Sequence, residues 1–119
     1  MTNNDIQALE LTINQAKEKI AFKDALEKLE SNGNFKKIVL EGYFKDEAIR
    51  LVHLKNDPSA NNPAIQEKIM KNIDAIGVFR QYLLNIQHTG IMAQKAIIEA
   101  EETKNEIYIE EATISNEVA

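Results

Sequence analysis

A chain of 119 residues without cysteine is long enough for one domain with an extension, and it has no disulfide and no thiolate metal site. Hydrophobic residues make up 44% and charged residues 28%, which supplies a core and excludes a largely disordered chain. Only four glycines and two prolines interrupt the sequence. This composition favours helices over strands, and we predict an all-α protein.

The net charge of −5 is concentrated at the C-terminal end. Residues 96–119 hold seven acids and one base, Lys104, whereas residues 1–95 are nearly neutral. Such an end repels nucleic acid and suits a basic protein surface. A charge run of this kind often serves only to keep a helix end solvated, and that alternative stays open.

The first predicted helix runs from about Asn4 to Ser31. Its apolar residues step by three and four positions along one seam: Ile6, Leu9, Ile13, Ala16 and Ile20. The next two seam positions, Lys23 and Glu27, are charged, so we expect the apolar stripe to move aside. The new stripe consists of Phe22, Leu26 and Leu29.

A second helix is predicted over about Phe35–Asn56, after a stop at Ser31-Asn32-Gly33-Asn34. In that stop, Gly33 suits a left-handed helix end and Asn34 suits the next helix cap. Apolar residues of the second helix cover more than one stripe, which predicts burial on two sides. Gly42 lies inside it at a cost of roughly 1 kcal/mol against alanine. A close approach of another helix at Gly42 would explain that glycine.

The third predicted helix begins at Pro63 and extends to about Ala112, a rod of roughly 70 Å at about 1.5 Å per residue. One apolar seam follows it: Ile69, Ile76, Phe79, Leu83, Ile86, Ala93, Ile97 and Ala100. The rest of the chain cannot cover so long a rod. Part of the seam must therefore meet another copy, another protein, or a bend in the helix itself, for which Gln87–Gly90 is the expected place.

From these three helices we predict an up-down-up bundle in which the third helix extends beyond the first two. We divide the chain into a helical domain, residues 1–100, and an acidic helical extension with a frayed tail, residues 101–119. The extension should lie beyond the reach of the first two helices. No apolar run approaches a membrane span and no signal pattern opens the chain, so we expect no membrane contact.

Enzyme motifs are missing: the sequence holds no phosphate-binding loop, no nucleophile elbow and no metal-binding pair of histidines. His53 and His88 lie alone on different helices. We therefore expect no enzyme activity, no cofactor and no metal. Acids interrupt the lysines between Lys17 and Lys37, and no aromatic ladder accompanies them, so direct nucleic-acid binding is a minor alternative.

The candidate functional residues are interface residues of the third helix: Ile76, Phe79, Arg80, Leu83, Ile86, Ile97, Ile107, Tyr108 and Ile109. Arginine is a common interface anchor, although Arg80 could equally reach solvent. Three apolar residues near the end, Ile107 to Ile109, are set among glutamates and suit a docking segment for a partner. The alternative is that the third helix bends and returns them to the protein's own core.

Three segments of the chain carry a resemblance to known proteins. They are Asp24-Ala25-Leu26 through Gly42-Tyr43-Phe44, Glu47-Ala48-Ile49-Arg50-Leu51-Val52, and Asn72-Ile73-Asp74-Ala75-Ile76-Gly77. Their pattern resembles small helical proteins of tailed bacteriophages, which are encoded near head genes and mostly have no assigned function. The resemblance implies a virion or virion-assembly protein, found in the host cytoplasm and then in the virion. It carries over no site residues.

Two functional hypotheses follow. The first is a non-enzymatic phage virion or assembly protein of the head or neck, acting through self-association or through binding another phage structural protein. The second is a small acidic regulatory protein that binds and inhibits a host protein, with the acidic end mimicking nucleic acid. A gene beside portal and capsid genes would favour the first, and an early-expressed gene cluster the second.

Overall fold

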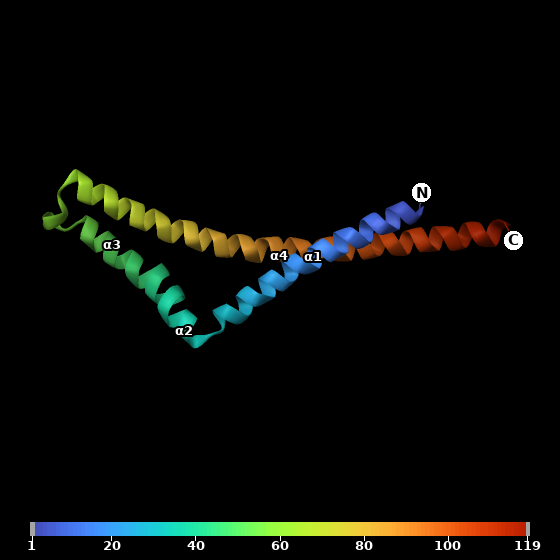
Figure 1. Ribbon diagram of the computed structural model, residues 1–119, viewed down its shortest axis with the longest axis horizontal. Helices are drawn as coiled ribbons and strands as arrows, with labels where there is room; N and C mark the ends of the chain where they lie inside the picture. Colours follow the sequence, from blue (N-terminus) through green and yellow to red (C-terminus); the bar gives the residue numbers. More distant parts are fainter. Residues whose placement is uncertain (1, 119) are drawn as a thin grey trace. The chain divides into compact units, whose positions relative to one another are not determined.

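The computed structural model describes residues 2–118, and all regular structure in that range is helical. α1 spans Thr2–Glu30 and α4 spans Pro63–Val118. Between them lie α2 (Gly33–Phe35), the π-helix η1 (Lys36–Glu47), α3 (Ala48–Lys55) and the 3₁₀ helix η2 (Pro58–Ala60). The prediction of an all-α protein with three helical segments and a long C-terminal helix is confirmed (Figure 1). The up-down-up bundle stays a prediction.

Asparagine and aspartate caps fix where the helical segments begin. Asn32 Oδ1 accepts hydrogen bonds from the backbone N–H groups of Asn34 and Phe35, at 2.9 and 3.1 Å. Asn62 Oδ1 accepts one from Ala64 at 2.8 Å, at the start of α4. The stop between α1 and α2 therefore rests on Asn32 rather than Asn34. Gly33 is not left-handed as predicted, since no described glycine has a positive φ.

The chain divides into two compact units. Unit 1 comprises residues 1–24 and 87–119, and unit 2 comprises residues 25–86. In unit 1, α1 and α4 run antiparallel, because Lys23 lies against Gly90 while Glu10 Oε1 meets Lys104 Nζ at 3.8 Å (Figure 1). The buried apolar residues of this pair are Ile13 and Ala16 of α1 and Ala93 and Ala100 of α4.

Lys23 keeps its place on the apolar seam of α1 although it is charged. It is 9% exposed, and its Cβ, Cγ and Cδ atoms fill the space beside Gly90. The aliphatic stem of a lysine packs as an apolar group while its ammonium reaches outward, and Lys23 Nζ lies 3.9 Å from Asp24 Oδ1. Of the predicted new stripe, Leu26 is buried at 5% exposure, whereas Phe22 and Leu29 are 55% and 46% exposed, so the move of the stripe is wrong for those two residues.

Unit 2 has its core where α3 meets the first part of α4. Leu51 and Ile69 lie at its centre with Ala60 and Ile76, and the half-buried residues around them are Tyr43, Phe44, Ala48, Leu54 and Ile73. The turn between the two helices is fixed by Gln66, whose Nε2 donates to the carbonyl oxygens of Lys55 and Ala60, each at 2.9 Å. One side-chain amide thus donates to two backbone carbonyls at this turn.

The middle segment is buried on one side only, which contradicts the prediction of two buried sides. Ile38, Ile49 and Val52 are 69%, 48% and 51% exposed. In η1 the half-buried residues are Val39, Leu40, Gly42, Tyr43, Phe44 and Glu47, and the backbone follows the i→i+5 hydrogen bonding of a π-helix. Gly42 meets no other helix. A Cβ there would lie 2.9 Å from the carbonyl oxygen of Lys37, five residues earlier in η1.

α4 stays helical through Gln87–Gly90, where the sequence predicts a bend. Gly90 instead admits the side chain of Lys23, because a Cβ at Gly90 would lie 2.4 Å from the Lys23 Cβ and Cδ atoms. Glycine therefore serves a close approach of two helices at this position. Within residues 2–118, no helix is long and apolar enough to cross a membrane.

Candidate interaction surfaces

The predicted interface residues of unit 2 divide between core and surface. Ile76 is 6% exposed and belongs to the core of unit 2, so it is not available to a partner. Phe79 is 36% exposed and packs its ring against Tyr43 and Phe44, with centroid distances of 6.2 and 5.4 Å. The remaining predicted residues are half-buried Leu83 and Ile86 and exposed Arg80.

The predicted interface residues of unit 1 behave in two ways. Ile97 and Ile107 are half-buried, on the side of α4 that faces α1. Tyr108 and Ile109 are 47% and 67% exposed. The expectation that α1 does not reach residues 101–119 is wrong for Lys104, whose side chain is only 17% exposed and pairs with Glu10. Of the predicted docking segment Ile107–Ile109, only Tyr108 and Ile109 are therefore exposed to a partner.

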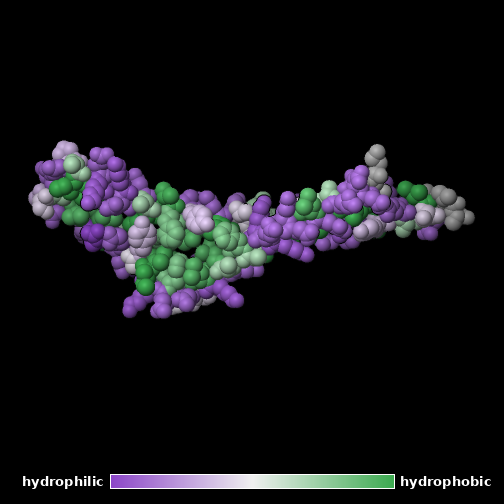
Figure 2. Space-filling view, viewed as in Figure 1, coloured by the Kyte–Doolittle hydropathy of each residue, from purple (hydrophilic) through white to green (hydrophobic). Residues whose placement is uncertain are grey.

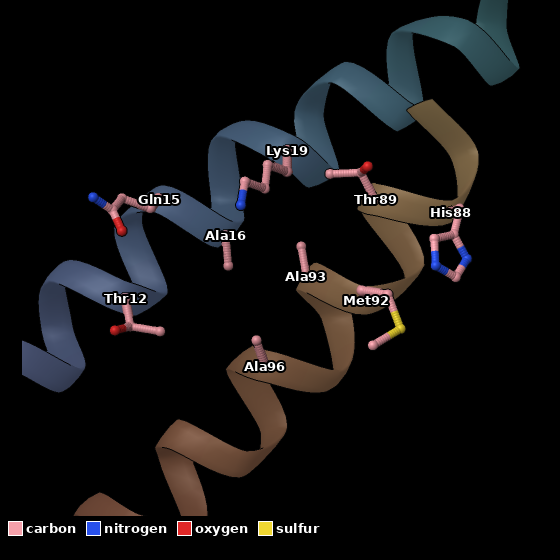
Figure 3. A pocket seen from close by; sticks show the side chains of 9 residues that line it. All are labelled: Thr12, Gln15, Ala16, Lys19, His88, Thr89, Met92, Ala93 and Ala96. Carbon is pink, nitrogen blue, oxygen red and sulfur yellow. The ribbon is translucent and has the colours of Figure 1, made fainter. Parts of the chain in front are cut away.

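A groove lies between α1 and α4 within unit 1, with a volume of about 340 Å³ (Figure 3). Its lining residues are Thr12, Gln15, Ala16, Lys19, His88, Thr89, Met92, Ala93 and Ala96. Alanines 16, 93 and 96 point into the space between the two helices, whereas His88 points away from α1 at the rim. Small side chains here leave room for the larger side chains of an added helix.

A shallow apolar surface of about 320 Å³ lies on α3, lined by Ala48, Ile49, Val52 and His53. Hydrophobic side chains also reach the surface over η1 and over the adjacent stretch of α4, both in unit 2 (Figure 2). Exposed single apolar residues are common on soluble proteins, but a contiguous group of them indicates a contact surface. Unit 2 thus offers an apolar face beside its core.

Among the charged groups of unit 2, Arg50, Glu47 and Asp57 form hydrogen bonds within the chain. Arg50 Nε donates to Glu47 Oε2 at 3.0 Å, and this hydrogen bond lowers the pKa of Glu47 and raises the pKa of Arg50. Hydrogen bonds from Ser59, first from its hydroxyl and then from its backbone N–H, lower the pKa of Asp57. Among the described residues, no group of three or more His, Cys, Asp or Glu side chains could hold a metal ion. The Arg50–Glu47 ion pair links the end of η1 to α3, and the hydrogen bonds of Asp57 with Ser59 cap the start of η2.

Sequence reasoning missed the groove of unit 1, because it considered the apolar seams and not the residues beside them. The signal was present. Thr89 and Ala96 are seven residues apart on one side of α4, and Thr12 and Lys19 are seven apart on α1. Sequence reasoning also interpreted Gly90 as a hinge. The close contact of Gly90 with Lys23 of α1 cannot be recognised before the pairing of the two helices is known.

Comparisons with models of protein families, with curated proteins and with solved structures find no match to this chain.

Proposed function

We propose that this protein is a non-enzymatic virion or virion-assembly protein of a tailed bacteriophage, acting in the head or neck through helix packing. The observation that carries the proposal is the amount of apolar surface that the helices leave uncovered. Each helical segment longer than three residues has at least one large hydrophobic side chain that is 36% exposed or more. Examples are Phe22, Ile38, Ile49, Val78 and Ile98. Where such side chains are contiguous, as around Ile49 and Val52 on α3, they indicate a contact surface.

Assembly by mass action supplies the mechanism. Apolar surface contributes about 25 cal/mol per Å² when it is removed from water, so faces of this kind become buried once copies or partner proteins reach a sufficient concentration. The partners are further copies of the chain or another phage structural protein. The resemblance of residues 24–44, 47–52 and 72–77 to small helical phage proteins directs the proposal to a virion.

Mass spectrometry of purified particles tests the proposal. Particles and head-assembly intermediates from an infected host should contain peptides of this chain in a fixed ratio to the major capsid protein. Absence from both preparations would contradict the proposal. Recovery of the chain only in a complex with a host protein would favour the inhibitor hypothesis, to which the exposed acids Glu99–Glu111 would be relevant.

A further inference from the structure

The groove of unit 1 exposes apolar side chains beside the seam along which its two helices pack. Two packed helices bury only the seam between them, and the groove runs beside that seam. Met92, which lines the groove, is 48% exposed. Phe22 is 55% exposed and follows Gln15 by seven residues, so it lies on the groove side of α1. We call this side of unit 1 the groove face.

The two halves of unit 1 carry opposite charge. The half made of residues 15–24 and 87–95 holds four lysines and two acids: Lys17, Lys19, Lys23, Lys95, Glu18 and Asp24. The half made of residues 3–14 and 96–116 holds eight acids and one base: Asp5, Glu10, Glu99, Glu101, Glu102, Glu106, Glu110, Glu111 and Lys104. One end of the helix pair is therefore basic and the other strongly acidic.

We propose that the groove face binds the groove face of a second copy, with the two helix pairs antiparallel and the two-fold axis near Ala96. A symmetric contact of this kind uses the same surface on both copies. Antiparallel pairing places the start of each acidic half, residues 97–105 with Glu99, Glu101 and Glu102, opposite residues 87–95 in the basic half of the other copy. Parallel pairing would place the two acidic halves together, where like charges repel. This pairing rests on the proposed function in one respect only: both take a second copy of the chain as the partner.

Small side chains at the centre of the groove face fit this arrangement. Ala96 lies on the same side of α4 as Thr89 and Thr103, seven residues before and after it. In an antiparallel pair centred at Ala96, Thr89 of one copy therefore faces Thr103 of the other. The same two threonines are about 21 Å apart within one copy, from about 1.5 Å of rise per residue.

Cross-linking distinguishes the two orientations because the chain has no native cysteine. Thr89→Cys and Thr103→Cys, both at exposed positions, are prepared separately in the full chain and treated with a short thiol-to-thiol reagent. The mixture of the two variants should give cross-linked dimers, whereas each variant alone should give at least tenfold less. Dimers from each variant alone and none from the mixture would overturn the antiparallel arrangement. No dimer in any sample would overturn the proposal altogether.

A charge inserted at the centre provides the second test. Ala96→Glu should abolish cross-linking of the mixed Cys variants, because it places two carboxylates together at the axis. The matched control is Gln94→Glu, which adds the same charge on another side of α4 and should preserve cross-linking. Both variants should keep the wild-type helical circular dichroism. Loss of cross-linking in both, or in neither, would contradict the location of the contact.

Salt provides a readout of the charge pattern. The excess of mixed over single-variant dimers should fall as salt is added, since the Debye length shortens from about 10 Å at 0.1 M to about 3 Å at 1 M. An excess that does not change with salt would contradict the electrostatic choice of orientation. If the cross-linking tests fail but the chain is found in purified particles, only the groove-face pairing is contradicted. If the cross-linking tests succeed but the chain is absent from particles, only the virion role is contradicted.

Discussion

Two glycines of α4 have the same helix propensity but different surroundings. Alanine is favoured over glycine inside a helix by about 1 kcal/mol. Gly77→Ala should raise the free energy of unfolding by about that amount, because a Cβ there has no neighbour within 4 Å. Gly90→Ala should instead lower it by about 1–3 kcal/mol, since the new methyl group overlaps the Lys23 stem and overpacks the contact.

Urea unfolding followed by circular dichroism measures both glycine variants. Lys23→Ala in the Gly90→Ala background should recover much of the loss, because it removes the overlapping atoms. A stabilised Gly90→Ala variant would show that α1 and α4 do not approach closely at this point.

Leu51 and Ile49 are neighbours on α3 with opposite exposure, 1% and 48%. Leu51→Ala should lower the free energy of unfolding by about 2–5 kcal/mol, the usual cost of deleting a buried leucine side chain. Ile49→Ala should cost less than about 1 kcal/mol in dilute protein, where the apolar face of α3 meets only water. Thermal unfolding of the two variants at equal concentration measures the contrast. Equal losses would place the core of unit 2 elsewhere.

Asp57 gives a residue-level prediction about pH. Its carboxylate accepts hydrogen bonds from the Ser59 hydroxyl at 2.7 Å and the Ser59 backbone N–H at 2.8 Å, which lower its pKa below 3.8. A carboxyl group with a lowered folded-state pKa stabilises the fold above its unfolded pKa. That contribution is lost as the pH falls through the folded value.

A carboxyl titration by NMR should therefore place the Asp57 midpoint below 3.8. Ser59→Ala should move the midpoint up toward 3.8 without reaching it, because the backbone N–H of residue 59 still donates. An unchanged midpoint in Ser59→Ala would show that the hydroxyl does not hold the carboxylate.

At the scale of elements, the end of α4 supports the beginning of α1. Truncation after Ala100 removes Lys104, which pairs with Glu10, and half-buried Ile107. We expect it to lower the free energy of unfolding by about 1 kcal/mol or more and to weaken hydrogen-exchange protection in residues 6–10. Truncation after Glu111 keeps both contacts and serves as the control. Equal stability of the two truncated chains would show that residues 101–111 do not support α1.

The sequence was sufficient to predict the existence of the helical segments and the long final helix. Short loops, a low glycine count and three- and four-residue apolar steps all indicate helices, and these signals are local. The π-helical turns of η1 could not be predicted, because their spacing of half-buried residues differs from the ordinary helical period only slightly over twelve residues.

Features that depend on pairing were beyond local reasoning. Lys23 looked like the end of an apolar seam, and Gly90 looked like a hinge. Each acquires its role only from the other, across the antiparallel contact of α1 with α4. The same holds for Ile76, which the seam pattern grouped with interface residues although it is buried in the core of unit 2. Periodicity shows which side of a helix is apolar, but it cannot show what covers that side.

At the scale of the whole molecule, each unit leaves apolar side chains exposed beside a small core. Unit 1 buries apolar residues along a single helix pair, and unit 2 has one face of α3 uncovered. These surfaces are expected to be buried by association, which links the sequence pattern of α4 to a role in assembly. A chain with such surfaces should change its apparent mass with concentration.

Sedimentation equilibrium of the purified full-length chain tests this central claim most directly. We predict that the average mass rises with concentration from the 13.5 kDa of one chain to at least twice that value. Ala96→Glu should shift this rise to higher concentration, whereas Gln94→Glu should not. A single species of 13.5 kDa across the whole concentration range would contradict the claim that these helices expose association surfaces.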